Sequence, residues 1–193
     1  MALKVKIEIS NRHIHLSEED LDSLFGNNYK LKIKRKLSQQ NDFAAEETVT
    51  ISNLLDSEKQ IKEIRIVGPA RAQTQVEILK SDLSKLGLNE VPLRISGDIT
   101  DTPGIFIDGP KSGIAIDEGL IIAKRHIHVS PEDAQKHHLT EGSRVSAKVL
   151  SSGRIIEHLN VRIKKGFTTV IHIDKDEALK FGVGTNEETE IIN

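Results

Sequence analysis

The sequence predicts a mainly β protein of two small β-barrels, related by internal duplication and capped by short α-helices. Short apolar stretches recur along the chain, and turns containing Gly, Pro or Asp separate them. The segment Arg12-His13-Ile14-His15 returns 113 residues later as Arg125-His126-Ile127-His128. Many short strands are typical of barrels, and two copies are too few for a solenoid. We expect the first half to span residues 1–110 and the second half to span residues 111–193.

The chain begins with a predicted strand. Apolar and polar residues alternate over residues 5–9, which is the two-residue period of a strand with one buried face. After the first histidine pair, Ser17 and Asp20 form the pattern of a helix cap, so a short helix is expected to end at Gly26.

The second copy repeats this order. Ser130 is the expected cap, Pro131 occupies the first helical position, and the helix should end between residues 139 and 142. Other strands are expected at residues 61–67, 75–78, 105–107, 120–123, 144–149, 160–163 and 168–173. Other short helices are expected at residues 81–86 and 174–181.

The composition excludes several classes of protein. The absence of Cys excludes a disulfide scaffold, a Cys-ligated zinc finger and a thiol nucleophile. Lys and Arg number 27 against 29 Asp and Glu, and aromatic residues make up only 3%, which argues against nucleic-acid binding. No apolar stretch approaches the roughly 18 residues of a membrane helix. The N-terminus lacks an apolar signal core, so we expect a cytoplasmic protein without a membrane partner.

The repeated histidine pairs indicate metal binding. Residues i and i+2 of a strand project to the same face, so His13 lies beside His15, and His126 lies beside His128. Two adjacent imidazoles can bind one ion, and Zn²⁺ suits a histidine-rich site without thiolates. An old duplication kept for packing alone is the alternative, although packing would favour apolar side chains over imidazoles without partners.

Three residues elsewhere are candidates for the same chemistry. His172 and Glu77 each lie within an apolar strand, where a polar side chain needs a partner, so they are candidates for the third ligands. Arg71 follows a Gly-Pro turn, and its planar guanidinium group suits a phosphate beside a metal ion. Three other histidines are expected to face solvent: His137, His138 and His158.

Several motifs together resemble the phosphotransacylase of the propanediol-utilisation type. The resemblance extends from about Val5 to Gly182. Its motifs are S-N-R-H-I-H-L-S, L-S-Q-x-x-x-F-A-A-E-E-T-V, G-P-x-R-x-x-T-Q-V-E-I, R-I-S-G-D, T-P-G-I, R-H-I-H-V-S-P-E-D-A and I-H-I-D-x-D-E-A. The resemblance implies a phosphate acyltransferase, which interconverts acyl-CoA (acetyl- or propanoyl-CoA) and phosphate with acyl phosphate and coenzyme A.

The resemblance also implies roles for particular residues. Two divalent metal ions, usually zinc, would be bound by two sets of ligands: His13, His15 and Glu77 in the first half, and His126, His128 and His172 in the second half. Arg71 would bind the phosphate as the catalytic residue. Coenzyme A contacts would fall on Ser10, Asn11, Arg12, Arg65 and Arg35. Leu179 stands where the family commonly has an Asn that contacts the coenzyme, so that contact is in doubt.

Other functions remain as alternatives. A cupin-like metal-dependent oxygenase or small-molecule binding module also uses His-x-His with Glu and His. It needs a Glu shortly after the histidine pair, whereas Glu18 and Glu19 fall at the expected start of a helix. A catalytically inactive coenzyme A-binding protein is disfavoured because all six ligand positions are intact. The chain is too short for a large α/β-barrel hydrolase of about 250 residues. A homodimer is a candidate assembly, and a microcompartment location is disfavoured because only nine residues precede Ser10.

Overall fold

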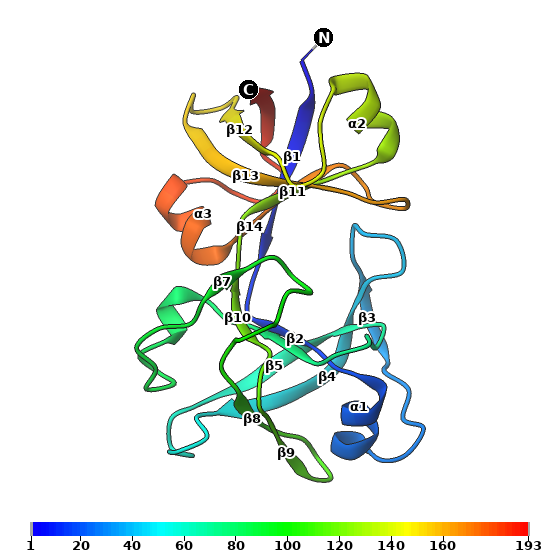
Figure 1. Ribbon diagram of the computed structural model, residues 1–193, viewed down its shortest axis with the longest axis vertical. Coiled ribbons are helices and arrows are strands. Elements are labelled where there is room, and N and C mark those ends of the chain that lie inside the picture. The colour runs from blue at the N-terminus through cyan, green and yellow to red at the C-terminus, as the bar shows by residue number, and fades with distance from the viewer. Residues whose placement is uncertain (1, 193) are drawn as a thin grey trace. The chain divides into compact units, whose positions relative to one another are not determined.

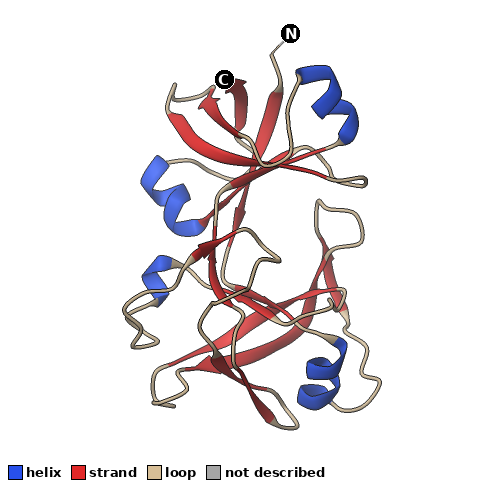
Figure 2. Cartoon of the chain, in the orientation of Figure 1, coloured by secondary structure: helices blue, strands red, loops and turns tan. Residues whose placement is uncertain are grey.

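Strands dominate the structure, a computed structural model that describes residues 2–192 (Figures 1 and 2). The strands are β1 (Lys4–Ser10), β2 (His13–His15), β3 (Ile33–Lys36), β4 (Phe43–Ser52), β5 (Gln60–Gly68), β6 (Gln75–Glu77), β7 (Leu93–Arg94), β8 (Ile105–Asp108), β9 (Gly113–Ile116), β10 (Leu120–Ala123), β11 (His126–Val129), β12 (Arg144–Val149), β13 (Ile155–Ile163), β14 (Val170–Asp174) and β15 (Glu188–Ile192). The helices are α1 (Glu18–Phe25), α2 (Pro131–His137) and α3 (Lys175–Phe181), with one 3-10 turn, η1 (Lys80–Asp82). Of the described helices, none is long and apolar enough to cross a membrane.

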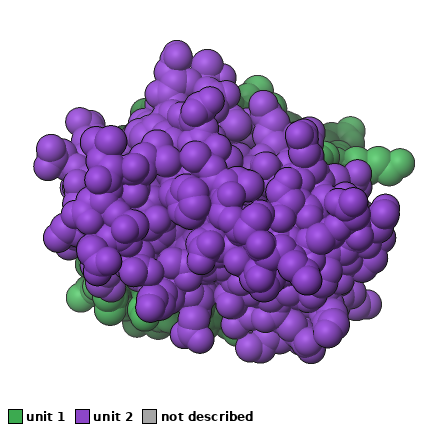
Figure 3. Space-filling model, turned by 90° about the horizontal axis from the view of Figure 1, so that it is seen from below, with its two compact units in different colours: residues 1–11, 124–193 green, residues 12–123 purple. Residues whose placement is uncertain are grey.

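The chain forms two compact units, which Figure 3 shows in green and purple. Unit 1 comprises residues 1–11 and 124–193, and its strands form a closed barrel in the order β1-β14-β11-β13-β12-β15. Alternate residues of each strand point into the barrel, as Ile7, Ile127 and Ile171 do with no exposed surface. The residues between them, including the histidines of β11 and β14, lie on the other face.

Unit 2 comprises residues 12–123 and contains a curled nine-stranded sheet. The order is β7-β10-β6-β2-β5-β4-β8-β9, and β3 pairs with β4. The short strand β2 lies between β5 and β6, so its two histidines have a strand on each side. Its central residue, Ile14, is fully buried in the core of this unit.

The strand that precedes each histidine repeat in the chain pairs with strands of the other unit. β1 precedes the first repeat in the chain but pairs with β14 and β15 in unit 1. β10 precedes the second repeat but pairs with β6 and β7 in unit 2. The chain therefore passes between units at residues 11–12 and 123–124, which differs from the expected joint between residues 110 and 111. Strand pairing over long sequence distance is the reason, because a local pattern does not specify a partner.

The predicted fold class, mainly β with barrel-like halves and short helices, is confirmed. Ser17 and Ser130 accept hydrogen bonds from the backbone N–H groups of Asp20 and Asp133, as the cap patterns predicted. The helix expected at residues 81–86 is wrong, because only the single turn η1 forms before Gly87 adopts a left-handed φ of 62°. The strands β3, β4, β7, β9 and β15 were not expected from the sequence.

Candidate metal centres

The first cluster lies in unit 2, where β2 and β6 run antiparallel and place His13 opposite Glu77. His15 follows on the same face of β2. One ligand atom from each of these three residues lies within 4.8 Å of the other two. Within residues 2–192 this is the one set of three His, Cys, Asp or Glu side chains that meets this distance. The sequence-predicted ligands of the first half are therefore brought together.

The hydrogen bonds of His15 leave one ring nitrogen for a metal ion. Its Nδ1 lies 2.9 Å from the carbonyl oxygen of Val67, and a carbonyl only accepts, so Nδ1 carries the proton and Nε2 carries the lone pair. Burial, together with the nearby charges of His13 and Arg71, lowers the pKa of His15 well below 6.5. The imidazole is therefore neutral near pH 7, which is the form that coordinates metals.

A hydrogen-bond network connects this cluster to Arg71. Arg71 Nη1 donates to Ser96 Oγ at 3.3 Å, and Gln75 Nε2 donates to the same oxygen at 2.9 Å. Gln75 Nε2 also donates to Glu77 Oε1 at 2.7 Å, and the side-chain Oε1 of Gln75 accepts from Gly97 N–H at 2.6 Å. The buried Gln75 amide thus contacts the carboxylate ligand directly and is connected to the guanidinium group through Ser96.

The second cluster lies in unit 1 and contains three histidines. β11 and β14 are antiparallel and place His126 opposite His172, with ring centroids 5.2 Å apart. His128 lies on the same face, with its ring centroid 4.7 Å from each of the other two. Phe167 stacks on His128 at 4.1 Å between centroids. The predicted ligands of the second half are also brought together, more loosely than those of unit 2.

The donor atoms of both clusters are of the types that bind a zinc-like ion. His126 Nδ1 lies 2.8 Å from the carbonyl oxygen of Lys124, so it carries the proton and its Nε2 presents a lone pair. That Nε2 faces His128 Nε2 at 3.0 Å. Two imidazole nitrogens at this separation are suited to a shared cation, because a tetrahedral ion with bonds of about 2.0–2.1 Å separates its ligands by about 3.3 Å. Nitrogen and carboxylate donors without thiolates match Zn²⁺ or a similar divalent ion.

Each half supports its histidine pair with the same hydrogen bonds. Arg12 Nε donates to Asp82 Oδ2 at 2.7 Å, and Arg125 Nε donates to Glu177 Oε1 at the same distance. Arg12 therefore makes a structural ion pair in addition to the coenzyme contact predicted for it.

A second matched feature fixes the turn after each histidine pair. Thr74 Oγ1 accepts from Ser17 N–H and donates to Asp20, and Thr169 does the same with Ser130 and Asp133. The two halves therefore share not only the R-H-I-H segment but also the hydrogen bonds of the turn that follows it.

The residues predicted to contact coenzyme A are distributed over both units. Ser10 and Asn11 belong to unit 1, whereas Arg12, Arg35 and Arg65 belong to unit 2. Arg65 pairs with His13 across β5 and β2, and its Nη1 donates to the carbonyls of two β4 residues. Arg35 lies on the exposed strand β3. Their common role in binding one ligand stays a prediction.

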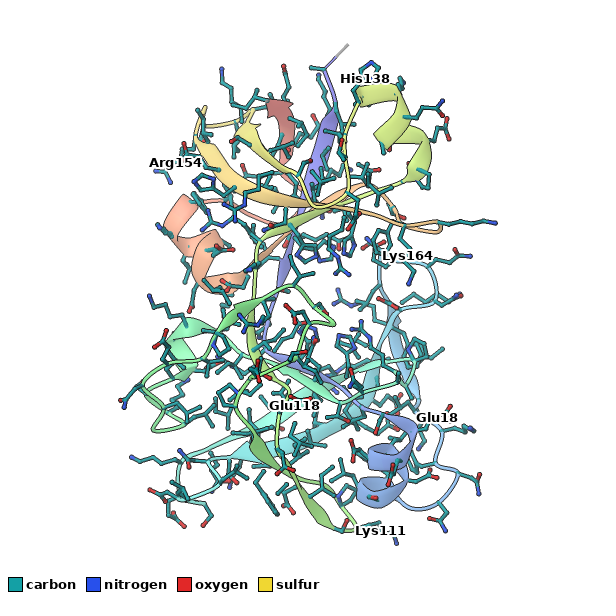
Figure 4. The ribbon with its side chains drawn as sticks, viewed as in Figure 1. Glu18, Lys111, Glu118, His138, Arg154 and Lys164 are labelled. Atoms are coloured by element: carbon teal, nitrogen blue, oxygen red, sulfur yellow. The ribbon has the colours of Figure 1, made fainter. Side chains whose placement is uncertain are left out.

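Three further predictions concern side chains away from the clusters. His138 ends α2 and is exposed, as Figure 4 shows, and His158 is exposed on β13. His137 is half-buried at the end of α2 and is not part of the donor set found within 4.8 Å. Leu179 on α3 is 74% exposed.

A cavity of about 650 Å³ in unit 2 shares Arg71 with the first cluster but contains none of its ligands. Its lining includes the first turn of α1 and two acidic residues labelled in Figure 4, Glu18 and Glu118. Acidic walls repel a phosphate or a coenzyme, so the metal cluster is the better candidate for the reacting groups.

Two residues that sequence reasoning left without a role belong to the site. Gln75 and Ser96 carry the network between Arg71 and Glu77. Gln75 and Glu77 are two residues apart in a strand, so their side chains project to the same face. This spacing could have identified Gln75 as part of the site. Ser96 lies within the R-I-S-G-D motif, but its contact with β6 depends on a fold that the sequence does not specify.

The fold and the two clusters define a β-barrel protein with duplicated histidine sites. The family model described as phosphate propanoyltransferase matches residues 6–184. The phosphate propanoyltransferase of Thermotoga maritima is 40% identical over 96% of this chain and 88% of its own length. The phosphate propanoyltransferase of Clostridioides difficile is 40% identical over 97% of this chain and 88% of its own length. That of Lachnoclostridium phytofermentans is 43% identical over 90% of this chain and 80% of its own length.

The chain belongs to the phosphate propanoyltransferase family. It is therefore an acyltransferase, and the family supports a phosphate acyltransferase activity. The resemblance inferred from the motifs is confirmed.

Proposed function

We propose that this protein transfers an acyl group, propanoyl or acetyl, between coenzyme A and inorganic phosphate, with two divalent metal ions as cofactors. The observation that carries the proposal is the donor set of His13, His15 and Glu77. Arg71 is connected to this set by hydrogen bonds through Ser96 and Gln75. His126, His128 and His172 would hold the second ion. When bound, such ions polarise oxygen atoms and stabilise a thiolate.

Arg71 binds and orients the phosphate in this proposal. Its guanidinium fork donates to two phosphate oxygens, and its Nη1 contact with Ser96 restricts its orientation. A phosphate oxygen attacks the thioester carbonyl carbon, a C–O bond forms, and the C–S bond breaks to release the thiolate of coenzyme A. The leaving thiol has a pKa of about 8.5 by analogy with Cys, so it departs as the anion without a strong acid.

No covalent acyl-enzyme is required. The sequence contains no Cys, so the chain has no thiol nucleophile that could carry the acyl group. Isotope exchange provides a test: labelled coenzyme A should enter the acyl-CoA pool only when phosphate is present. Exchange without phosphate would reject direct attack.

The experiment for the whole proposal combines metal analysis with coenzyme release. We expect the purified protein to contain zinc-like ions and to release free coenzyme A from propanoyl-CoA only with phosphate. His126→Ala should lower the metal content by one equivalent and abolish transfer, whereas the exposed His158→Ala should change neither. Full activity after complete metal removal would reject the metal-dependent mechanism.

A further inference from the structure

A carboxylate outside the predicted ligand set lies against the three-histidine cluster. Glu8 Oε2 of β1 is 3.1 Å from Nε2 of His172. Resting on the proposed metal-dependent function, we propose that Glu8 is the fourth ligand of the ion held by His126, His128 and His172.

Strand register places Glu8 in this cluster. β1, β14 and β11 are consecutive in the barrel, and their partners align Glu8 with His172 and His172 with His126. Residues aligned across neighbouring strands project to the same face. The inward neighbours Ile7 and Ile171 are fully buried in the barrel core, so Glu8 and His172 share the opposite face.

Two pairs of donors have separations that suit a four-coordinate ion. His126 Nε2 and His128 Nε2 are 3.0 Å apart, and His172 Nε2 and Glu8 Oε2 are 3.1 Å apart. Both separations are close to the edge of about 3.3 Å expected for a tetrahedral zinc site. Two such pairs supply the four donors that this geometry requires. No three of these four described residues have donor atoms within 4.8 Å of one another, so binding of the ion must bring the two pairs closer together.

Comparison with unit 2 explains why a carboxylate belongs there. In unit 2, the residues paired across three neighbouring strands are Ile121, Glu77 and His13. In unit 1, the corresponding residues are Glu8, His172 and His126. Each set of three contains one carboxylate, but at a different place. With Glu8, both clusters offer a divalent ion one negative ligand, whereas three neutral imidazoles alone offer none.

The ordinary alternative is a surface ion pair. The side chains of His172 and Glu8 are 21% and 33% exposed, and an exposed pair contributes at most about 1 kcal/mol to stability. Such a pair would hold His172 in place without contacting a metal ion. Glu8→Gln distinguishes the two roles, because Gln keeps the size and the hydrogen-bonding oxygen but is a poor metal ligand.

The test uses the full chain carrying His13→Ala and His15→Ala, so that the remaining metal binding reports on unit 1. Zn²⁺ affinity is measured by competition with a chromophoric chelator, and Co²⁺ coordination by visible absorption. Glu8→Gln is compared with Glu190→Gln, a carboxylate on β15 whose strand partner is Lys4. Thermal unfolding of the metal-free proteins verifies that each variant folds.

The proposal predicts that Glu8→Gln weakens Zn²⁺ binding at least about tenfold and changes the Co²⁺ spectrum, whereas Glu190→Gln changes neither. Unchanged affinity overturns the proposal, and so does weaker binding with an unchanged Co²⁺ spectrum, which would assign Glu8 to positioning His172. If His126→Ala in the same background also leaves binding unchanged, the proposed metal centre itself fails.

Discussion

Replacement of Gln75 by Met should destabilise the protein more than any other single change in the network around Arg71. Gln75 is 3% exposed, and its amide makes three hydrogen bonds, to Gly97 N–H, Ser96 Oγ and Glu77 Oε1. Methionine fills the same volume without replacing them. Two neutral hydrogen bonds contribute about 1 kcal/mol each and one to a carboxylate contributes about 2 kcal/mol, giving an expected loss of about 4 kcal/mol.

The measurement is urea and thermal unfolding of the metal-free protein. A loss of this size corresponds to roughly 10 °C in Tm for a chain of this length. Gln73→Met is the matched control, because Gln73 is exposed two residues earlier and should change stability by less than about 0.5 kcal/mol. A loss below about 1 kcal/mol for Gln75→Met, or equal losses for both variants, would refute the role of Gln75 as the buried link of this network.

Three further predictions concern the phosphate site, the histidine environment and the duplication. Arg71→Ala should lower kcat/KM for phosphate about 10- to 100-fold at unchanged metal content, with Arg71→Lys intermediate; wild-type kinetics would reject phosphate binding by this residue. Since burial lowers the pKa of His15, the unfolded state binds the extra proton below pH 6.5. The difference in unfolding free energy between wild type and His15→Gln, measured by urea unfolding without metal, should therefore decrease as the pH is lowered from about 8 to about 5.5. A difference that stays constant over this range contradicts the prediction. Thr74→Val and Thr169→Val should each cost about 1–3 kcal/mol in unfolding free energy, and a silent variant would show that the matched turns are not equivalent.

Much of the site could be predicted because its residues lie in repeated local patterns. The His-x-His spacing within a strand places both rings on one face whatever the strand pairs with. His172 and Glu77 were identifiable as polar residues within apolar strands. The caps at Ser17 and Ser130 depend only on residues three positions away, so they formed as predicted.

The rest depends on which strands pair, and local sequence does not encode it. The alternation over residues 5–9 predicts a strand, but not that its neighbours are β14 and β15. Glu8 consequently looks like an ordinary solvent-facing residue in the sequence. Its proximity to His172 results from parallel pairing with a strand more than 160 residues away. Ser96 escaped assignment for the same reason, since only the fold brings it to β6.

The strand exchange also affects the order in which the chain can fold during synthesis. The strands of unit 2 are continuous in the chain, so all of them leave the ribosome before β11 does. β1 leaves before the other described strands, yet its pairing partners β14 and β15 emerge only after all strands of unit 2. A strand with one apolar face therefore stays without its native partners until more than 160 further residues have been made, which exposes it to wrong pairing. The charged side chains at alternate positions of this strand, Lys4, Lys6 and Glu8, then also discourage association of the unpaired strand edge with other chains.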